Sequence, residues 1–223
     1  MTEKYSISNP QRKPRSKAET IIIKLIEKKH DIKTHYELYL KSFLQFIGLD
    51  NQRINVCEIG GFDGWALSYD NGLINKTVID VEDDYEDELN NKGIGFVHHD
   101  FNTILNTKVE YDVVLMNHVI EHLKDYEVMM LNLHKMIKAG GFIIIRCPNI
   151  LNQKLKFYHD YTHVKPYTPT SVERMFNSFG FKKVYIGGFN YTKFVVRWLF
   201  GNYSPVMSGT EILYVGQKKE ALL

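Results

Sequence analysis

The chain has 223 residues, of which 44% are hydrophobic and 24% charged, and its formal net charge at pH 7 is +2. These values are typical of one globular domain with a full core, and the near-neutral charge gives no general reason to expect a polyanionic partner. No apolar run reaches bilayer length and no signal-peptide core opens the chain, so we predict a cytoplasmic protein without membrane contact. The two cysteines, Cys57 and Cys147, lie in apolar runs and are interpreted as buried thiols rather than a disulfide.

The N-terminal part is polar at first and then helix-like. Residues 1–17 are basic and contain two prolines, which predicts an arm in front of a single domain over 18–223. A basic arm could bind nucleic acid, but such runs are more often solvated tails, and we do not predict a nucleic-acid partner from it. Apolar spacing within 18–50 predicts two helices, the second from Tyr36 to Ile47 with Gly48 ending it.

From residue 54 onward, strand-like runs alternate with helix-like segments. Strands are predicted at 54–59, 76–80, 93–100, 111–117, 142–148, 181–188 and 211–217. Helices are predicted from Trp65, from the acidic block 82–88, at about 123–137 and at 171–180, with a turn at 139–141. The alternation predicts an α/β fold, a doubly wound, mostly parallel seven-stranded sheet with helices on both faces. The last strand is expected to be antiparallel, since no convincing crossover helix precedes it.

The stretch I-N-V-C-E-I-G-G-F-D-G-W carries the first functional signal. A strand runs into a glycine cluster at Gly60, Gly61 and Gly64, and glycine lets the backbone approach a nucleotide-like ligand closely. Glu58 places a carboxylate just before this turn. A carboxylate there is poor for cradling phosphates and good for holding a cation or a hydroxyl.

Acidic and polar residues also end the next strands. Asp80, Asp100 and Asn117 follow three apolar runs, and ligands of doubly wound sheets bind outside the carboxyl ends of the strands. The chain has neither G-x-G-x-x-G nor a P-loop sequence, and several carboxylates would repel a pyrophosphate. The set suits a ligand with hydroxyls, an exocyclic amine and a positive charge.

These residues resemble the class I S-adenosylmethionine-dependent methyltransferases over about 54–217. E-I-G-G-F-D-G resembles the E/D-x-G-x-G-x-G loop of that family, although Phe62 replaces its middle glycine, and Y-D-V-V-L-M-N-H-V-I-E-H-L resembles its fourth-strand motif. D-Y-T-H-V-K-P-Y-T is similar to bacterial members associated with sugar and secondary-metabolite clusters. The resemblance implies S-adenosyl-L-methionine as cofactor, with Asp80 at the ribose and Asp100 at the adenine amine. The cofactor-binding residues that it implies are Glu58, Gly60, Gly61, Phe62, Gly64, Asp80, Val81, Asp100, Phe101, Asn117 and His118.

Histidines supply the candidate catalytic residues. His118, Glu121 and His122 match H-x-x-E-H of inverted zinc proteases, but His118 follows a strand end and no third ligand is evident, so we predict no metal. His122 is a candidate general base, because its ordinary pKa lies near neutrality.

The loop 149–169 is predicted to bind the substrate, and 189–209 to act as a second lid segment. A histidine in the first loop, His163 in our prediction, could deprotonate a hydroxyl, whereas His159, Asp160 and His163 together could hold a divalent metal. The predicted substrate residues are His159, Asp160, Tyr161 and Tyr167.

We therefore predict methyl transfer from S-adenosylmethionine to a small molecule, most readily O-methylation of a sugar-like or secondary-metabolite acceptor. One alternative is an RNA methyltransferase, although N-H-V-I stands where base-modifying relatives carry N/D-P-P-Y/F. Another is a module that binds the cofactor without turnover. An apolar helix near Trp198 is interpreted as a lid or a dimer surface, so a homodimer is possible.

Overall fold

The computed structural model describes residues 32–189 and 209–219. The basic arm, the first predicted helix and most of the segment 189–209, including Trp198, lie outside the described residues. The predictions of an arm, of a second lid segment and of a dimer surface therefore stay predictions.

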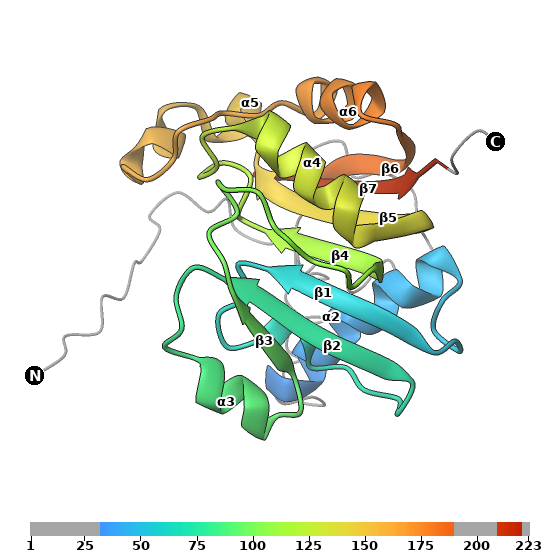
Figure 1. Cartoon of the computed structure of the whole chain (residues 1–223). Helices are drawn as coiled ribbons and strands as arrows, with labels where there is room; N and C mark the ends of the chain where they lie inside the picture. Colours follow the sequence, from blue (N-terminus) through green and yellow to red (C-terminus); the bar gives the residue numbers. More distant parts are fainter. Residues whose placement is uncertain (1–31, 190–208, 220–223) are drawn as a thin grey trace, which may run out of the picture. The chain divides into compact units, whose positions relative to one another are not determined.

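The strands form one seven-stranded sheet in the order β3-β2-β1-β4-β5-β7-β6 (Figure 1). Strands β1 to β5 pair in parallel, and β7 runs antiparallel to both β5 and β6. This arrangement confirms the predicted doubly wound sheet and its antiparallel last strand. The strands are β1 (Ile54–Ile59), β2 (Ile74–Asp80), β3 (Gly95–His98), β4 (Tyr111–Asn117), β5 (Ile137–Pro148), β6 (Phe181–Phe189) and β7 (Glu211–Lys218).

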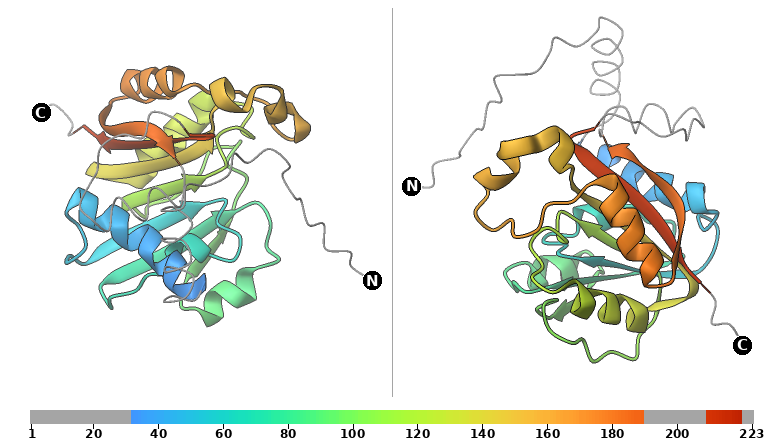
Figure 2. Two further views of the ribbon diagram at one scale, coloured as in Figure 1. Left: turned by 180° about the vertical axis from the view of Figure 1, so that it is seen from behind. Right: turned by 90° about the horizontal axis from the view of Figure 1, so that it is seen from above.

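Helices cover both faces of the sheet. Helix α2 lies against one face, whereas α4 and α6 lie against the other (Figures 1 and 2). The described helical elements are α2 (Ile32–Ile47), the 3-10 helix η1 (Trp65–Leu67), α3 (Glu86–Asn91), α4 (Tyr126–Met136), α5 (Ile150–Gln153), the 3-10 helix η2 (Lys154–His159) and α6 (Pro169–Ser178).

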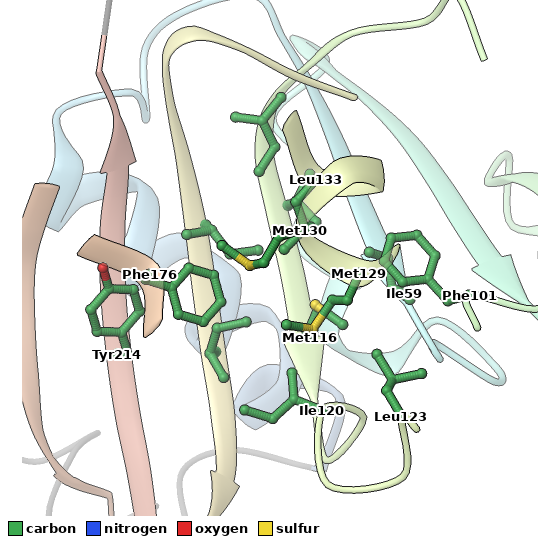
Figure 3. Packing of buried hydrophobic residues seen from close by; sticks show 14 of the residues in the cluster. Ile59, Phe101, Met116, Ile120, Leu123, Met129, Met130, Leu133, Phe176 and Tyr214 are labelled. Carbon is green, nitrogen blue, oxygen red and sulfur yellow. The ribbon is translucent and has the colours of Figure 1, made fainter. Parts of the chain in front are cut away.

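Alternate residues of the central strands face opposite layers, which explains why the strands are apolar throughout. Val113 and Leu115 of β4 belong to the core under α2, and Val114 and Met116 belong to the core under α4 and α6. Figure 3 shows the second core, in which side chains of α4 pack on β1 and β4. In the same core the rings of Phe176 and Tyr214 lie 4.9 Å apart, centroid to centroid.

Side-chain caps decide where two helices begin. The Asp125 carboxylate accepts hydrogen bonds from the backbone N–H groups of Glu127 and Val128, so α4 begins at Tyr126, three residues later than predicted. Thr168 and Ser171 form a capping box, and α6 therefore begins at Pro169, two residues earlier than predicted.

Three predicted boundaries are wrong. The segment 139–141 lies inside β5, which starts at Ile137. Gly140 has a φ of +75°, so the strand bends there without ending. The glycine turn leads only to the three-residue η1, since a second turn follows in which the Asp70 carboxylate accepts the N–H of Gly72. Strand β3 ends at His98, two residues before Asp100.

Cys57 and Cys147 are buried and unpaired, as predicted. Within the ranges 32–189 and 209–219, no helix has the length and apolar character needed to cross a bilayer.

Candidate functional site

The strand order reverses between β1 and β4, which is where open α/β sheets bind ligands. Glu58 near the end of β1 and Asn117 at the end of β4 meet at this point. The Asn117 amide nitrogen Nδ2 donates to Oε1 of Glu58 at 2.8 Å, and the Tyr39 hydroxyl of α2 donates to Oδ1 of Asn117. The pairing joins two predicted site residues and adds Tyr39, which the sequence reading missed.

Glu58 is a buried acid. Its side chain is 1% exposed, and its Oε2 has no hydrogen-bond partner within the described part of the chain. Burial raises the pKa of Glu58 to about 8, and the hydrogen bond from Asn117 and the charge of Arg146 offset only part of this rise. A cationic ligand beside Oε2 would stabilise the ionised carboxylate.

The glycine turn keeps a glycine-like backbone although Phe62 occupies its middle. Phe62 has a φ of +45°, and its N–H donates to Oδ2 of Asp80 at 3.1 Å. Its ring is 52% exposed and meets Tyr85 edge-on. The turn also packs closely, since a Cβ on Gly60 would lie 2.6 Å from Cγ2 of Val119. Phe62 therefore preserves the path of the chain and leaves an aromatic face at the surface of the site.

The end of β2 presents one buried acid and one exposed apolar side chain. Asp80 is 6% exposed, and its two oxygens accept the N–H groups of Phe62 and Glu82. Val81 beside it is 55% exposed. This pair can offer a carboxylate to ribose hydroxyls and an apolar surface to a flat base.

Beyond β3, Asp100 and Phe101 differ from each other. Asp100 is exposed, and hydrogen bonds from the Asn102 backbone and side chain, each 2.9 Å, lower the pKa of its carboxyl group. Phe101 is 4% exposed and belongs to the core under α4. Asp100 is therefore exposed and Phe101 is part of the core, and the ligand contact of each stays a prediction.

After β4 the chain turns sharply at His118, whose φ is +55°. Its Nδ1 lies 3.2 Å from Oε1 of Glu121, and its Nε2 lies 3.4 Å from Oε1 of Glu211. Burial alone would lower the pKa of His118, but the nearby carboxylates of Glu121 and Glu211 outweigh it and raise the pKa to about 9. The Nε of Arg146 also donates to Nε2 of His118 at 3.3 Å, so His118 lies between one cation and two carboxylates.

The cation beside His118 is Arg146 of β5. Its Nε donates to Oε2 of Glu211 at 2.9 Å, and its guanidinium lies 5.0 to 5.9 Å from the ring centroids of Phe189, Trp65 and Tyr39. Sequence reading missed Arg146 and Glu211, although Arg146 is the one charged residue within the apolar run 142–148.

The two candidate catalytic histidines come together from different loops. The His122 and His163 rings lie 4.9 Å apart, centroid to centroid. The backbone N–H groups of Val164 and Lys165 donate to the carbonyl oxygen of Glu121 at 2.9 and 3.1 Å, which holds the loop after β5 against the turn after β4. Tertiary hydrogen bonds therefore create this pair.

The remaining predicted substrate residues are not gathered at one place. His159, Asp160 and Tyr161 are exposed, and the Tyr161 side chain is 95% exposed. Tyr167 is instead 4% exposed, belongs to the core under α4 and α6, and its hydroxyl donates to the Ile120 carbonyl oxygen at 3.4 Å. Tyr167 therefore packs in the core, and the substrate role of all four residues stays a prediction.

Comparisons with known proteins identify the family and the fold. A family model described as a methyltransferase domain matches residues 32–186. No curated protein matches the sequence significantly.

Among solved structures, the fold is similar to a SAM-dependent methyltransferase from Archaeoglobus fulgidus (TM-score 0.61, 19% identity, covering 88% of this chain and 99% of the other). It is also similar to an S-adenosylmethionine-dependent methyltransferase from Clostridium acetobutylicum (TM-score 0.63, 11% identity, covering 91% and 98%). A third similar structure is the plantazolicin methyltransferase BpumL in complex with SAH (TM-score 0.63, 16% identity, covering 92% and 91%).

Proposed function

The chain belongs to the methyltransferase-domain family, and from this premise we propose that it transfers a methyl group from S-adenosylmethionine to a hydroxyl of a small molecule. That the chain is an S-adenosylmethionine-dependent methyltransferase follows from the family and the fold. The small-molecule acceptor and the oxygen nucleophile are the proposed part.

The residues at the ends of β1 and β2 fit the cofactor. The buried, unpartnered Oε2 of Glu58 calls for a positive charge, and Asp80 with Val81 suits a ribose and an adenine. S-adenosylmethionine supplies a methyl group on a sulfonium, which is already a good electrophile. The protein therefore needs mainly to position the acceptor in line with the methyl–sulfur bond and to remove the proton of the hydroxyl.

The observation that carries the oxygen acceptor is the orientation of His122 and His163. The Nδ1 of His163 lies 2.7 Å from the carbonyl oxygen of Phe157, which only accepts, so Nδ1 carries the proton and Nε2 keeps a lone pair. Two imidazoles on loops beyond the carboxyl ends of β4 and β5 suit activation of a hydroxyl. The side-chain amide of Asn117 is hydrogen-bonded to Glu58 on the cofactor side. The two histidines are therefore the residues that we propose for the acceptor.

The acceptor class is proposed from two further points. The loop 149–169 contains exposed polar and aromatic side chains, which suit a hydroxylated, sugar-like or secondary-metabolite acceptor. One of the structures with a similar fold is a plantazolicin methyltransferase.

Incubation with methyl-labelled cofactor and an acceptor library, followed by mass spectrometry, tests the proposal. We expect label on a hydroxyl of a small molecule and none on RNA. Label on RNA alone would replace the proposal with the nucleic-acid alternative. Calorimetric binding of the cofactor with no label in any acceptor would support a module without turnover.

A further inference from the structure

Three side chains at the acceptor side form a cluster with metal-binding chemistry. One ligand atom each from Glu121, His122 and His163 lies within 4.8 Å of the others. Glu121 and His122 come from the turn after β4, and His163 comes from the loop after β5. The sequence reading rejected a metal at His118, Glu121 and His122 because His118 follows a strand end and no third ligand was evident, and it left a divalent metal at His159, Asp160 and His163 open. The fold supplies that third ligand from a position forty-one residues later than His122 (163 − 122).

The hydrogen bonds around His122 place its lone pair on Nε2. The Thr162 hydroxyl donates its single proton to Oδ1 of Asp160 at 2.6 Å, so toward His122 it acts as an acceptor. Its oxygen lies 3.0 Å from Nδ1 of His122, and the Thr162 carbonyl oxygen lies 3.3 Å from the same nitrogen. Two acceptors therefore face Nδ1, which carries the proton.

His163 has the same arrangement. Its Nδ1 faces the carbonyl oxygen of Phe157 at 2.7 Å, and its Nε2 lies 3.7 Å from Oδ2 of Asp160. A backbone carbonyl or hydroxyl on one ring nitrogen is the usual setting of a metal-binding histidine, because it leaves the other nitrogen as the ligand. In both histidines Nε2 is therefore the candidate ligand atom, and in His163 the Asp160 carboxylate lies beside it.

Glu121 supplies the independent argument for a cation. Its side chain is 0% exposed, and neither Oε1 nor Oε2 has a hydrogen-bond partner among residues 32–189 and 209–219. Its Oε1 lies at ion-pair distance from Nδ1 of His118, 3.2 Å away, and its Oε2 has no ion-pair partner among the described residues. Buried carboxylate oxygens are nearly always hydrogen-bonded or bound to a cation, so an unpartnered one points to a missing ligand.

We propose that Glu121, His122 and His163 bind one divalent transition-metal ion, and that this ion holds the acceptor hydroxyl. Two imidazoles and one carboxylate suit zinc, iron(II), manganese or cobalt and leave coordination positions open for an oxygen. Metal–ligand bonds of about 2.1 Å place ligand atoms about 3 to 4 Å apart, so side-chain shifts of about 1 Å close the site. The sequence H-V-I-E-H lies in a turn before α4, so the helical inverted-zinc-protease geometry is absent and His118 serves as the orienting partner of Glu121.

The second half of the proposal rests on the proposed O-methylation. A bound divalent ion lowers the pKa of a coordinated oxygen, so the hydroxyl gives up its proton to solvent. The oxygen electron pair then forms the bond to the methyl carbon. The methyl–sulfur bond breaks, and its electron pair stays on sulfur as a neutral thioether. In this scheme the histidines bind the ion and do not themselves take the proton.

Metal binding to the full-length chain, freed of any affinity tag and treated with chelator, tests the site. Titration with cobalt, zinc and manganese should give one ion per chain, and cobalt should develop an absorption spectrum typical of nitrogen and oxygen ligands. The variants Glu121→Gln, His122→Ala and His163→Ala should each weaken binding at least about tenfold. The control is His98→Ala, because His98 is exposed at the end of β3 and lies outside both loops of the cluster, and it should bind the ion as the wild type does.

Failure of the metal site and failure of the proposed reaction give different results. No ion bound, or equal loss of binding in His98→Ala and His163→Ala, overturns the site. Methyl transfer that persists in chelator but needs His122 overturns the role of the ion and leaves O-methylation standing. Specific metal binding without methyl transfer to any hydroxyl overturns the proposed reaction and leaves the site standing. Each variant is checked by circular dichroism and thermal melting, so a folding defect is recognised.

Discussion

The proposed cofactor side and the proposed acceptor side of this protein are built in different ways. The cofactor side consists of strand ends and one tight turn, and its backbone positions follow from residues 54–64 and from Asp80. The acceptor side consists of two loops held together by hydrogen bonds from Val164 and Lys165 to the Glu121 carbonyl oxygen. The first kind of site is visible in a short motif, and the second exists only after folding. Such a division lets one fold keep its cofactor while loops change its acceptor.

The largest expected effect is on the acceptor side. His122→Ala or His163→Ala should lower the rate of methyl transfer by about 10²- to 10⁴-fold, since activation of the hydroxyl is lost. Cofactor affinity, measured by calorimetry, should stay within about twofold of the wild type, because neither histidine contacts the glycine turn. Activity within tenfold of the wild type in both variants would show that the two sides are not divided in this way.

Glu58→Gln should act on the cofactor side alone. Above pH 8 the variant should bind the cofactor about 10- to 100-fold more weakly, the loss expected for a hydrogen bond to a charged group. Wild-type affinity should rise with pH up to about 8, because the pKa of Glu58 is raised to about 8 and a cationic ligand favours the ionised form. The variant should lack this pH dependence. Glu110→Gln is the control, since Glu110 is exposed and precedes β4 at the opposite edge of the sheet, and calorimetry from pH 6 to 9 measures all three proteins.

The same carboxylate makes a prediction about the stability of the free protein. The pKa of Glu58 rises from 4.5 to about 8 on folding, so the native state keeps a proton that the unfolded chain releases. Stability relative to Glu58→Gln should therefore fall as pH rises from about 4.5 to 8, by at most about 1.4 kcal/mol per pH unit. Denaturant unfolding at several pH values gives the difference. A constant difference across this range would mean that Glu58 is not desolvated.

Thr162→Val tests how the acceptor side is held. The hydroxyl of Thr162 links Asp160 to Nδ1 of His122, so its loss should weaken metal binding about 3- to 10-fold and leave cofactor affinity unchanged. Thr162→Ser keeps the hydroxyl and should restore binding. Equal metal affinity in the valine and serine variants would remove Thr162 from the site.

The smallest expected effect belongs to Phe62→Gly. Glycine accepts the φ of +45° without steric cost, which should raise the free energy of unfolding by up to about 1 kcal/mol. The greater backbone entropy that glycine loses on folding offsets part of this gain. Cofactor affinity should stay the same or improve if the exposed ring only covers the turn. A large loss of affinity in calorimetry would mean that the ring contacts the ligand.

Much of the cofactor side could be predicted because its information is local. Apolar runs end at Glu58, Asp80 and Asn117, and parallel strands bring their carboxyl ends to one edge of the sheet. Val81 and Phe101 were predicted together as ligand contacts, yet one side chain is exposed and the other is core. The period of a strand does not continue through the loop after it, so burial there could not be predicted.

The sequence by itself determined the fold class, the strand segments and the residues at the strand ends. These follow from hydrophobic period and glycine positions, which act over short distances along the chain. Only the tertiary structure decided that Tyr39 reaches Asn117, that Arg146 pairs with Glu211, and that His163 joins Glu121 and His122. Those contacts join residues far apart in the chain, and their geometry is set by how the loops pack on the finished sheet.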